Sequence, residues 1–247
     1  EMPVHYPGFK GGDRTDIQLP DVQRNCLKAL KAAGKKVVYV NCSGSAVGLL
    51  PETESCDAIL QAWYGGESGG QAVADVLFGD YNPSGKLPIT FYKDTTQLPG
   101  FEDYTMKGRT YRYLNSKPLC PFGYGLSYTS FSIGEAQVSK TEVKSNDNIQ
   151  LAIPVSNTGK RDGTEIVQVY VRRSGDTSGL SKTLRGFQRI EVAKGKTSNA
   201  VIDLPYASFE FFDENTLQVK VVPGEYEIFY GNSSDSKDLK MTKISVL

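Results

Sequence analysis

The sequence predicts an α/β layer domain with a mainly parallel sheet, followed by an all-β sandwich. Two observations support this prediction. Helix and strand patterns alternate through the first half of the 247 residues, and only the two-residue period of β-strands remains in the second half. The change of period places a domain boundary between Gly125 and Glu135. We therefore assign residues 1–128 to the first domain and residues 129–247 to the second.

A helix is predicted directly after Leu19, in "LPDVQRNCLKALKAAG". Pro20 needs no backbone N–H at a helix start, and the charge of Asp21 suits the positive end of the helix dipole. Gly34 supplies a left-handed residue at the end of the helix. Four residues recur on one face of this helix: Val22, Cys26, Leu27 and Leu30.

Three short strands and one more helix complete the first domain. Residues 35–42 and 57–63 are continuous apolar runs, typical of strands buried on both faces. Val73, Val76 and Leu77 mark a helix that ends at Gly79, and "KLPITF", residues 86–91, is the last predicted strand. Doubly wound sheets usually have about five or six strands, so we expect that the domain is truncated at its N-terminal side.

The second domain is predicted from alternating strands. In "NIQLAIPVSNTG" the apolar residues Ile149, Leu151, Ile153 and Val155 alternate with other residues. "EIVQVYVRR", "GFQRIEV", "NAVIDLP", "LQVKVV" and "EYEIFYG" follow, separated by Gly-containing turn signals. This series of short strands predicts a sandwich of the fibronectin type III or immunoglobulin-like kind.

Composition narrows the range of partners. Lys plus Arg and Asp plus Glu both number 28, so the formal net charge is zero. Nucleic acids and anionic membranes bind proteins with an excess of positive charge, so we expect neither as a partner. No apolar run approaches the length of a membrane helix, about 20 residues, so we expect no membrane-spanning segment either. A single histidine and four cysteines without a C-x-x-C pair predict no metal site and no cofactor. Free, buried thiols are the favoured state for Cys26 and Cys42, and a disulfide bond is the alternative.

A glycine-rich loop in "QAWYGGESGGQAVADVLFGD" lies where a strand meets a helix. Free N–H groups at such a place can bind anions. However, no Lys-Ser or Lys-Thr follows the glycines, and the G-x-G-x-x-G spacing of dinucleotide sites does not fit. A tight strand-to-helix turn is therefore favoured over a phosphate site.

Several segments resemble glycoside hydrolase family 3, the β-glucosidases and β-xylosidases. "AWYGGESGGQAVADVLFGDYNPSGKLPITF" is similar to the signature of that family's C-terminal α/β sandwich domain. "GGDRTDIQLPDVQ" and "RTYRYLNSKPLCPFGYGLSYTSF" resemble the start and the exit of that domain. "IPVSNTGKRDGTEIVQVYV" and "LRGFQRIEVAKG" resemble the fibronectin type III-like module that follows it. Gly65 departs from the pattern, because many relatives carry proline there.

The resemblance implies a retaining, exo-acting β-glycosidase built from a TIM barrel, this α/β domain and the β module. Retention requires two carboxylates about 5 to 5.5 Å apart. The family's nucleophilic aspartate lies on the barrel, outside this chain. Its general acid/base is usually a glutamate shortly before an Asp-Arg pair, which corresponds here to Asp13 and Arg14. Glu1 is the one carboxylate before that pair in the chain, so it is the candidate acid/base, with an acid upstream of residue 1 as the alternative.

Other residues are weaker candidates for sugar contacts. Trp63 could border a sugar subsite, with a core role beside Leu60 as the favoured alternative. His5 and Tyr6 could line the substrate site, although a solvated loop is the default for both. Glu67 suits a helix N-terminus whether or not it touches the substrate.

Two functions of different classes remain open. The first is the C-terminal part of a β-xylosidase or β-glucosidase that removes terminal sugars from plant oligosaccharides such as those of xylan. "MPVHYPGFKGG" and "KGRTYRYL" slightly favour the xylosidase branch. The second is a non-catalytic carbohydrate-binding or scaffolding protein. The resemblance also implies the barrel as a partner within the same protein and a periplasmic or secreted location. The incomplete sheet edge favours self-association, which includes a homodimer.

Overall fold

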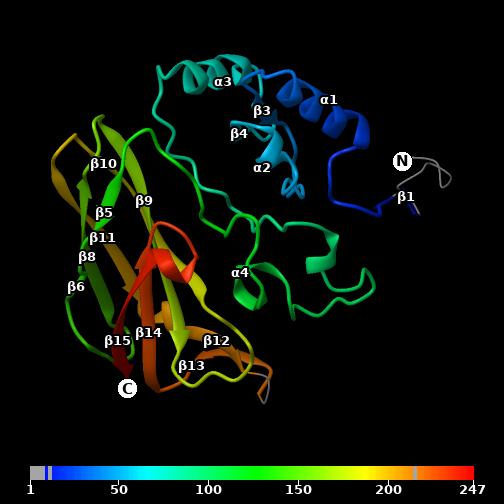
Figure 1. The fold of residues 1–247 in the computed structure, drawn as a ribbon. Coiled ribbons are helices and arrows are strands. Elements are labelled where there is room, and N and C mark those ends of the chain that lie inside the picture. The colour runs from blue at the N-terminus through cyan, green and yellow to red at the C-terminus, as the bar shows by residue number, and fades with distance from the viewer. Residues whose placement is uncertain (1–8, 11–12, 214–215) are drawn as a thin grey trace. The chain divides into compact units, whose positions relative to one another are not determined.

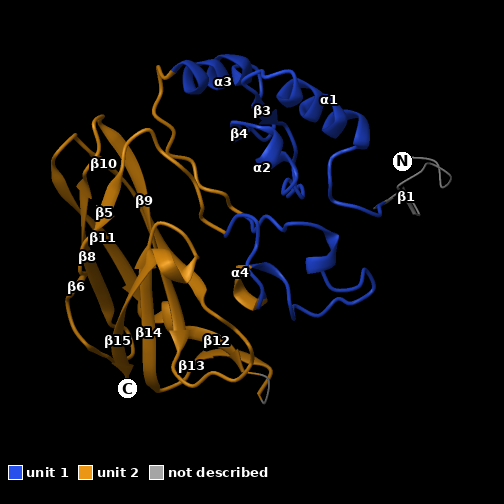
Figure 2. Ribbon diagram, viewed as in Figure 1, with its two compact units in different colours: residues 1–78, 89–110, 114–121 blue, residues 79–88, 111–113, 122–247 orange. Residues whose placement is uncertain are grey.

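The computed structural model describes residues 9–10, 13–213 and 216–247. The chain forms two compact units (Figure 2). The first unit contains residues 1–78, 89–110 and 114–121, and the second contains residues 79–88, 111–113 and 122–247. The two units are thus discontinuous in sequence. The boundary at residues 128 and 129 stays a prediction.

The first unit is a mixed α/β region with a small parallel sheet. β3 and β4 pair in parallel, with Asn41 opposite Gln61 at their carboxyl ends. The short strands β1 and β2 pair with each other in antiparallel fashion. Its helices and strands are β1 (Phe9–Lys10), β2 (Asp13–Arg14), α1 (Asp21–Ala32), β3 (Val38–Asn41), α2 (Glu52–Ser55), β4 (Ala58–Gln61), α3 (Gly69–Phe78) and the 3-10 turn η1 (Thr95–Gln97).

The bounds of the two long helices confirm the predicted signals. Pro20 precedes α1 as its N-cap, and Gly34 follows it with a φ of 70°. Gly79 follows α3 with a φ of 85°. Glycine adopts these left-handed conformations without the steric cost of a side chain, so each helix ends where the sequence predicts.

Burial on both faces of residues 35–42 was a wrong prediction. Val38 is 48% exposed, and Tyr39 and Val40 are only partly buried. The reason is that the core of this unit is small and packs against one side of the strand pair. That core consists of Leu19, Val47 and Leu49, with Leu27, Tyr39, Ile59 and Leu119 around it. On α1, only Leu27 of the predicted apolar face joins it.

The predicted strand at residues 86–91 is also absent. Leu87 donates to the carbonyl of Tyr124, and Phe91 forms an isolated antiparallel bridge with Cys120. Pro88 lies between these two short pairings and has no N–H to donate. The apolar run is therefore an extended segment with two separate partners.

The expected burial of Cys26 and Cys42 was wrong as well. Both are exposed, whereas Cys56 is buried and Cys120 is intermediate, and all four are free thiols. Cys26 lies on the part of α1 that the small core does not reach, and Cys42 lies one residue beyond the end of β3.

The second unit is a β-sandwich, as predicted. One sheet has the order β10-β9-β14-β15-β7, and the other has the order β11-β8-β5, with β6 also paired to β8 (Figure 1). Its strands are β5 (Phe131–Ile133), β6 (Gln137–Val138), β7 (Glu142–Val143), β8 (Asn148–Asn157), β9 (Gly163–Arg173), β10 (Thr183–Val192), β11 (Thr197–Pro205), β12 (Glu210–Asp213), β13 (Gln218–Val221), β14 (Gly224–Gly231) and β15 (Leu239–Val246). The chain also forms three short helices: α4 (Thr110–Tyr113), η2 (Tyr206–Phe209) and η3 (Ser236–Asp238).

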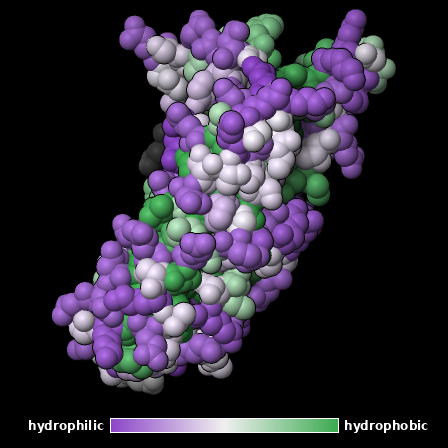
Figure 3. Space-filling model, turned by 90° about the vertical axis from the view of Figure 1, so that its left-hand side faces the viewer, coloured by the Kyte–Doolittle hydropathy of each residue, from purple (hydrophilic) through white to green (hydrophobic). Residues whose placement is uncertain are grey.

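Alternating residues of both sheets form the core of the sandwich. Ile149, Leu151, Ile153 and Val155 of β8 are fully buried, as their spacing predicts. Residues of the other sheet, such as Val167, Val169 and Val171, join the same cluster. On the face shown in Figure 3, hydrophobic residues form small separate areas among hydrophilic ones. Burial of apolar side chains between the two sheets therefore stabilises this unit.

A third layer covers the outer face of the five-stranded sheet. It comes from residues 79–88, 111–113 and 122–128, which belong to the second unit. The rings of Tyr111 and Phe122 stack with their centroids 4.4 Å apart, and both rings meet the buried ring of Tyr170 in β9 edge-on. Gln168 donates to the carbonyls of Gly123 and Asn232 and accepts from the Tyr170 hydroxyl. Both faces of β9 are therefore buried.

Candidate functional site

The carboxyl ends of β3 and β4 hold a closed network of polar side chains. Asn41 is 3% exposed, and its amide donates to Gln61 Oε1 at 2.6 Å and to Ser43 Oγ at 2.9 Å. The Tyr39 hydroxyl donates to Asn41 Oδ1 at 3.0 Å. Every polar atom of the Asn41 side chain thus has a protein partner. The network fixes the loops that leave the two strands, and ligands of open α/β sheets bind at such edges.

Trp63 follows β4 in an uncommon backbone conformation. Its φ is 55°, in the left-handed region that bulky residues rarely adopt. The indole is partly buried and meets the ring of Phe91 edge-to-face, with centroids 6.1 Å apart. A backbone outlier of this kind is kept only where its surroundings hold it, and such outliers cluster at functional sites. The contact with Phe91 is the packing role that competes with sugar binding, and the sugar contact stays a prediction.

The glycine loop after Trp63 is a tight strand-to-helix turn. Gly66 has a φ of 64°, and a Cβ on Gly65 would lie 2.8 Å from the Cα of Gly69. The backbone N–H of Gly69 donates to the carbonyl of Gly66 at 3.2 Å. The backbone conformation therefore explains Gly66, and the close approach of Gly69 explains Gly65. A proline at position 65 would have to avoid the same contact with Gly69. Glu67 is exposed on this loop.

Tyr64 forms a second exposed side of the loop. Its ring lies against Gly44, where an added Cβ would come within 2.8 Å of it. Tyr64 is itself 78% exposed. The loops after β3 and β4 thus meet through an aromatic side chain that sequence reasoning missed, although its place directly after Trp63 is a usable signal.

The three N-terminal candidates, Glu1, His5 and Tyr6, lie outside the described residues. Nearby, Arg14 donates to the carbonyl of Gln18. Asp16 accepts from the Gln18 N–H at 2.9 Å and from the Thr95 hydroxyl at 3.1 Å. These bonds attach the segment before α1 to the rest of the first unit.

A buried ion pair of the first unit was not found from the sequence. Glu52 is 1% exposed, and its Oε1 accepts from Arg24 Nε at 3.2 Å. Arg24 also donates to Gln18 Oε1 at 2.6 Å. Burial and then the Glu52 charge raise the pKa of Tyr39. The pair fixes α1 to α2, because breaking it would leave a buried charge without compensation.

Among the described residues, no three His, Cys, Asp or Glu side chains come together in a way that would hold a metal ion. No described helix combines the length and apolar character of a membrane span.

Comparison with known proteins identifies both halves of the chain. Residues 6–128 match the model of the glycosyl hydrolase family 3 C-terminal domain, and residues 165–234 match that of a fibronectin type III-like domain. A xylan 1,4-beta-xylosidase of Xylanibacter ruminicola is 59% identical over 246 residues, 100% of this chain and 28% of that protein. A periplasmic beta-glucosidase of Salmonella typhimurium is 36% identical over 238 residues, 91% of this chain and 31% of that protein.

Solved structures give the same result. A β-glucosidase from Erythrobacter marinus matches with a TM-score of 0.83 and 38% identity, over 99% of this chain and 32% of that one. A Listeria innocua β-glucosidase in complex with isofagomine matches with a TM-score of 0.80 and 27% identity, over 97% and 35%. The chain thus spans about a third of the length of these relatives. It belongs to glycosyl hydrolase family 3, of which it carries the C-terminal domain followed by a fibronectin type III-like domain.

Proposed function

We propose that the chain is the C-terminal part of a retaining, exo-acting β-glycosidase that acts on terminal β-linked sugars, with β-xylosides preferred over β-glucosides. The observation that carries this proposal is the 59% identity to a xylan 1,4-beta-xylosidase over the whole chain. The relatives named β-glucosidase are more distant, at 36% and 38% identity.

The proposed chemistry needs two carboxylates. One attacks the anomeric carbon, and the other first protonates the departing oxygen and then activates water as a base. We assign the acid/base role to Glu1 and the nucleophile to a barrel domain of the same protein. Trp63, His5 and Tyr6 are the proposed sugar contacts of this chain.

Local geometry supports a positioning role for the first unit. The Asn41 network fixes the carboxyl ends of β3 and β4, and the contact with Phe91 holds the Trp63 ring. Catalysis depends on such rigid support, because a displacement of about 1 Å can cost about a hundredfold in rate. Cleavage therefore requires this unit and the barrel together.

The exposed apolar residues of the first unit support a larger domain around it. Val22 and Val38 are 76% and 48% exposed, and among the described residues β3 and β4 form a parallel sheet of two strands. We propose that further strands of a mainly parallel sheet and the barrel cover this surface. Since the Salmonella typhimurium relative is named periplasmic, we propose a periplasmic or secreted location. Self-association, including a homodimer, is proposed for the chain without these parts.

The test compares the 247-residue chain with the full-length protein on aryl β-xylosides and aryl β-glucosides. We expect that the full-length protein hydrolyses the xyloside faster, with retention seen as the β-anomer first in the NMR spectrum. The chain alone should be inactive. Inactivity of both proteins, with binding of oligosaccharides intact, would instead support a carbohydrate-binding or scaffolding role.

A further inference from the structure

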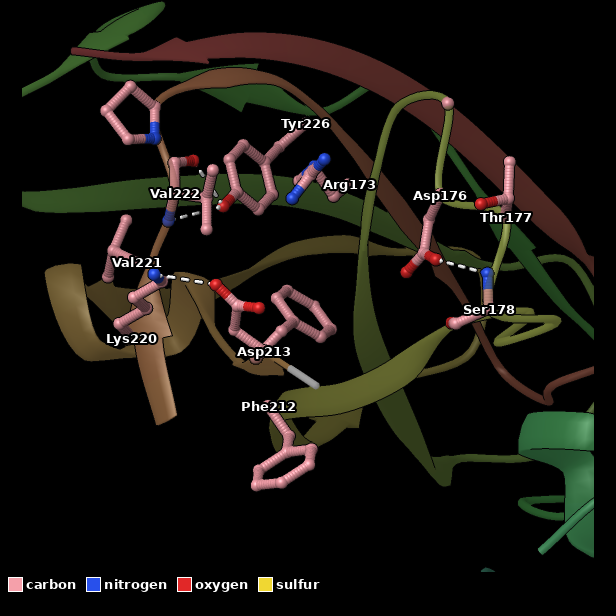
Figure 4. Close-up of a pocket in the computed structure, with 13 residues that line it drawn as sticks. Arg173, Asp176, Thr177, Ser178, Phe212, Asp213, Lys220, Val221, Val222 and Tyr226 are labelled. Atoms are coloured by element: carbon pink, nitrogen blue, oxygen red, sulfur yellow. Dashed lines mark hydrogen bonds and ion pairs between the residues drawn. The ribbon is translucent and has the colours of Figure 1, made fainter. Parts of the chain in front are cut away.

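The second unit contains a cleft that the proposed catalytic role does not use. It measures about 570 Å³ and lies where β9, the loop after it, the β12–β13 hairpin and the start of β14 meet (Figure 4). Small-molecule sites commonly span about 300 to 1,000 Å³. Its polar side chains are Arg173, Asp176, Thr177, Ser178, Asp213 and Lys220, and its apolar ones include Phe211, Val221, Val222, Pro223 and Tyr226.

Positive and negative side chains line the cleft in equal number. Lys220 forms an ion pair with Asp213 at 2.6 Å. Asp176 uses Oδ1 to accept the N–H of Ser178 at 2.8 Å, so the loop fixes its carboxylate. Arg173 is exposed, and its guanidinium makes no hydrogen bond or ion pair among the described residues. Two cations and two anions therefore face one space, with donors and acceptors side by side.

The apolar side of the cleft combines Phe211 with aliphatic side chains, and the buried Tyr226 fixes it from behind. The Tyr226 hydroxyl donates to the carbonyl of Val222 at 2.7 Å, which holds the turn before β14. The ring of Phe211 stacks on Tyr226 with centroids 6.2 Å apart, and the Arg185 guanidinium lies 4.8 Å from the Phe211 centroid. Unlike Phe211, which stacks on Tyr226, Phe212 has a ring that points away from Asp213 in Figure 4. Tyr226 is fully buried behind this wall, so the apolar side chains that the cleft offers to a ligand are Phe211, Val221, Val222 and Pro223.

We propose that this cleft binds a neutral oligosaccharide. Each sugar hydroxyl donates and accepts hydrogen bonds at once, so a sugar can use the Arg173 donors and the Asp176 acceptor together. The C–H faces of its rings match an aromatic and aliphatic wall. A phosphate-bearing ligand would instead need an excess of positive charge, which the two carboxylates cancel. The choice of a β-linked xylo- or gluco-oligosaccharide rests on the proposed function.

NMR of the intact 247-residue chain tests the proposal, with xylotetraose, cellotetraose, the α-linked maltotetraose and inorganic phosphate as probes. We expect that xylotetraose or cellotetraose shifts the signals of Val221, Val222 and Tyr226, whereas phosphate does not. Arg173→Ala should weaken binding about tenfold, the effect of one hydrogen bond to a charged group. Lys160→Ala, which removes the same charge from an exposed turn outside the cleft, should leave binding unchanged.

Three results would overturn the proposal: no shift of the lining residues with any β-linked probe, equal binding by Arg173→Ala and the parent chain, or shifts with phosphate alone. Equal response to maltotetraose would overturn only the β-linked choice. Because the test measures binding without turnover, its failure is distinct from failure of the proposed hydrolysis. A full-length protein that cleaves β-xylosides while its cleft binds nothing would retain the proposed function and lose this site.

Discussion

Lys86 and Glu165 form an ion pair of 2.8 Å in which the two side chains are only 11% and 5% exposed. Lys86 also donates to the carbonyl of Gly125 at 3.1 Å, and Glu165 accepts from the Asn232 amide at 3.1 Å. The pair therefore links the covering layer to β9 and to the end of β14. Each charge has both a partner of opposite sign and a further hydrogen bond, which is what a buried pair requires.

Removing one partner of this pair should destabilise the sandwich strongly. Lys86→Met leaves the Glu165 carboxylate buried without its cation, so we expect a loss of about 3 kcal/mol in the free energy of unfolding. Urea unfolding followed by far-UV circular dichroism measures it. Lys140→Ala breaks the more exposed pair with Asp147 and should cost less than about 1 kcal/mol. Similar losses in the two variants would contradict a special role for the buried pair.

Gly123 is predicted to tolerate no side chain. Its φ is 78°, and a Cβ there would lie 1.9 Å from Oε1 of Gln168, which three hydrogen bonds hold in place. Gly123→Ala should therefore cost at least about 2 kcal/mol, through both steric overlap and backbone strain. The control is Gly195→Ala, where φ is 69° and nothing lies within 4 Å of the added Cβ. A smaller loss at Gly123 than at Gly195, measured by urea unfolding, would refute the overlap.

Excision tests where the second domain begins. A fragment of residues 129–247 loses the layer that covers Gln168 and Tyr170, whereas residues 79–247 keep it. We expect a lower thermal midpoint for the shorter fragment and stronger binding of a hydrophobic dye, because it exposes an apolar and aromatic face. Equal midpoints for the two fragments would support the boundary at residues 128 and 129 and make the covering layer dispensable.

The sequence predicts elements well where local chemistry decides the structure. The alternation from Ile149 to Val155 predicts both β8 and the residues that it buries. Pro20 and Gly34 predict the bounds of α1 in the same local way. By contrast, nothing in the strand pattern of "EIVQVYVRR" predicts the burial of the polar Gln168, which is 3% exposed. Its burial depends on segments that lie 45 or more residues away, as its bond to Gly123 shows.

The candidate site is predicted less completely, for a similar reason. Trp63 lies at the end of a strand, where the sequence places it, but its partner Phe91 comes from a run that read as a strand of its own. The pair of Arg24 and Glu52 joins two helices, and neither residue belongs to a recognisable pattern. Contacts of this kind depend on tertiary structure, which single-sequence patterns do not report.

Asp57 should make the stability of the first unit depend on pH. The backbone N–H of Val37 donates to it at 2.9 Å, and Lys36 and Lys31 lie at 3.3 and 3.4 Å, which lowers its pKa from 3.8 to about 2. Because the folded pKa is lower than the unfolded one, the stabilisation is complete above the unfolded pKa of 3.8 and is lost as the pH falls to about 2.

The measurement uses fluorescence of Trp63, the single tryptophan of the chain, which reports on the first unit. Urea unfolding of the parent and of Asp57→Asn should differ by a constant amount near neutral pH. The difference should shrink as the pH falls from about 4 to about 2, because the parent then loses the charge that the variant lacks. A difference that is independent of pH across this window would show that the charge of Asp57 contributes nothing.

The proposed acid/base role of Glu1 is testable in the full-length protein through the leaving group. A general acid contributes about 10²- to 10⁴-fold when the departing oxygen needs a proton. Glu1→Ala should therefore abolish cleavage of xylo-oligosaccharides but spare formation of the glycosyl-enzyme from dinitrophenyl xyloside. Turnover should then stall at the second step, where the same residue acts as base toward water. Azide needs no base, so it should restore turnover and yield a β-glycosyl azide. Glu54→Ala is the matched control, since Glu54 is an exposed glutamate of α2 and is not a candidate for the site; it should leave both substrates and the azide response unchanged. If Glu1→Ala slows both substrates equally and azide has no effect, the acid/base is a different carboxylate.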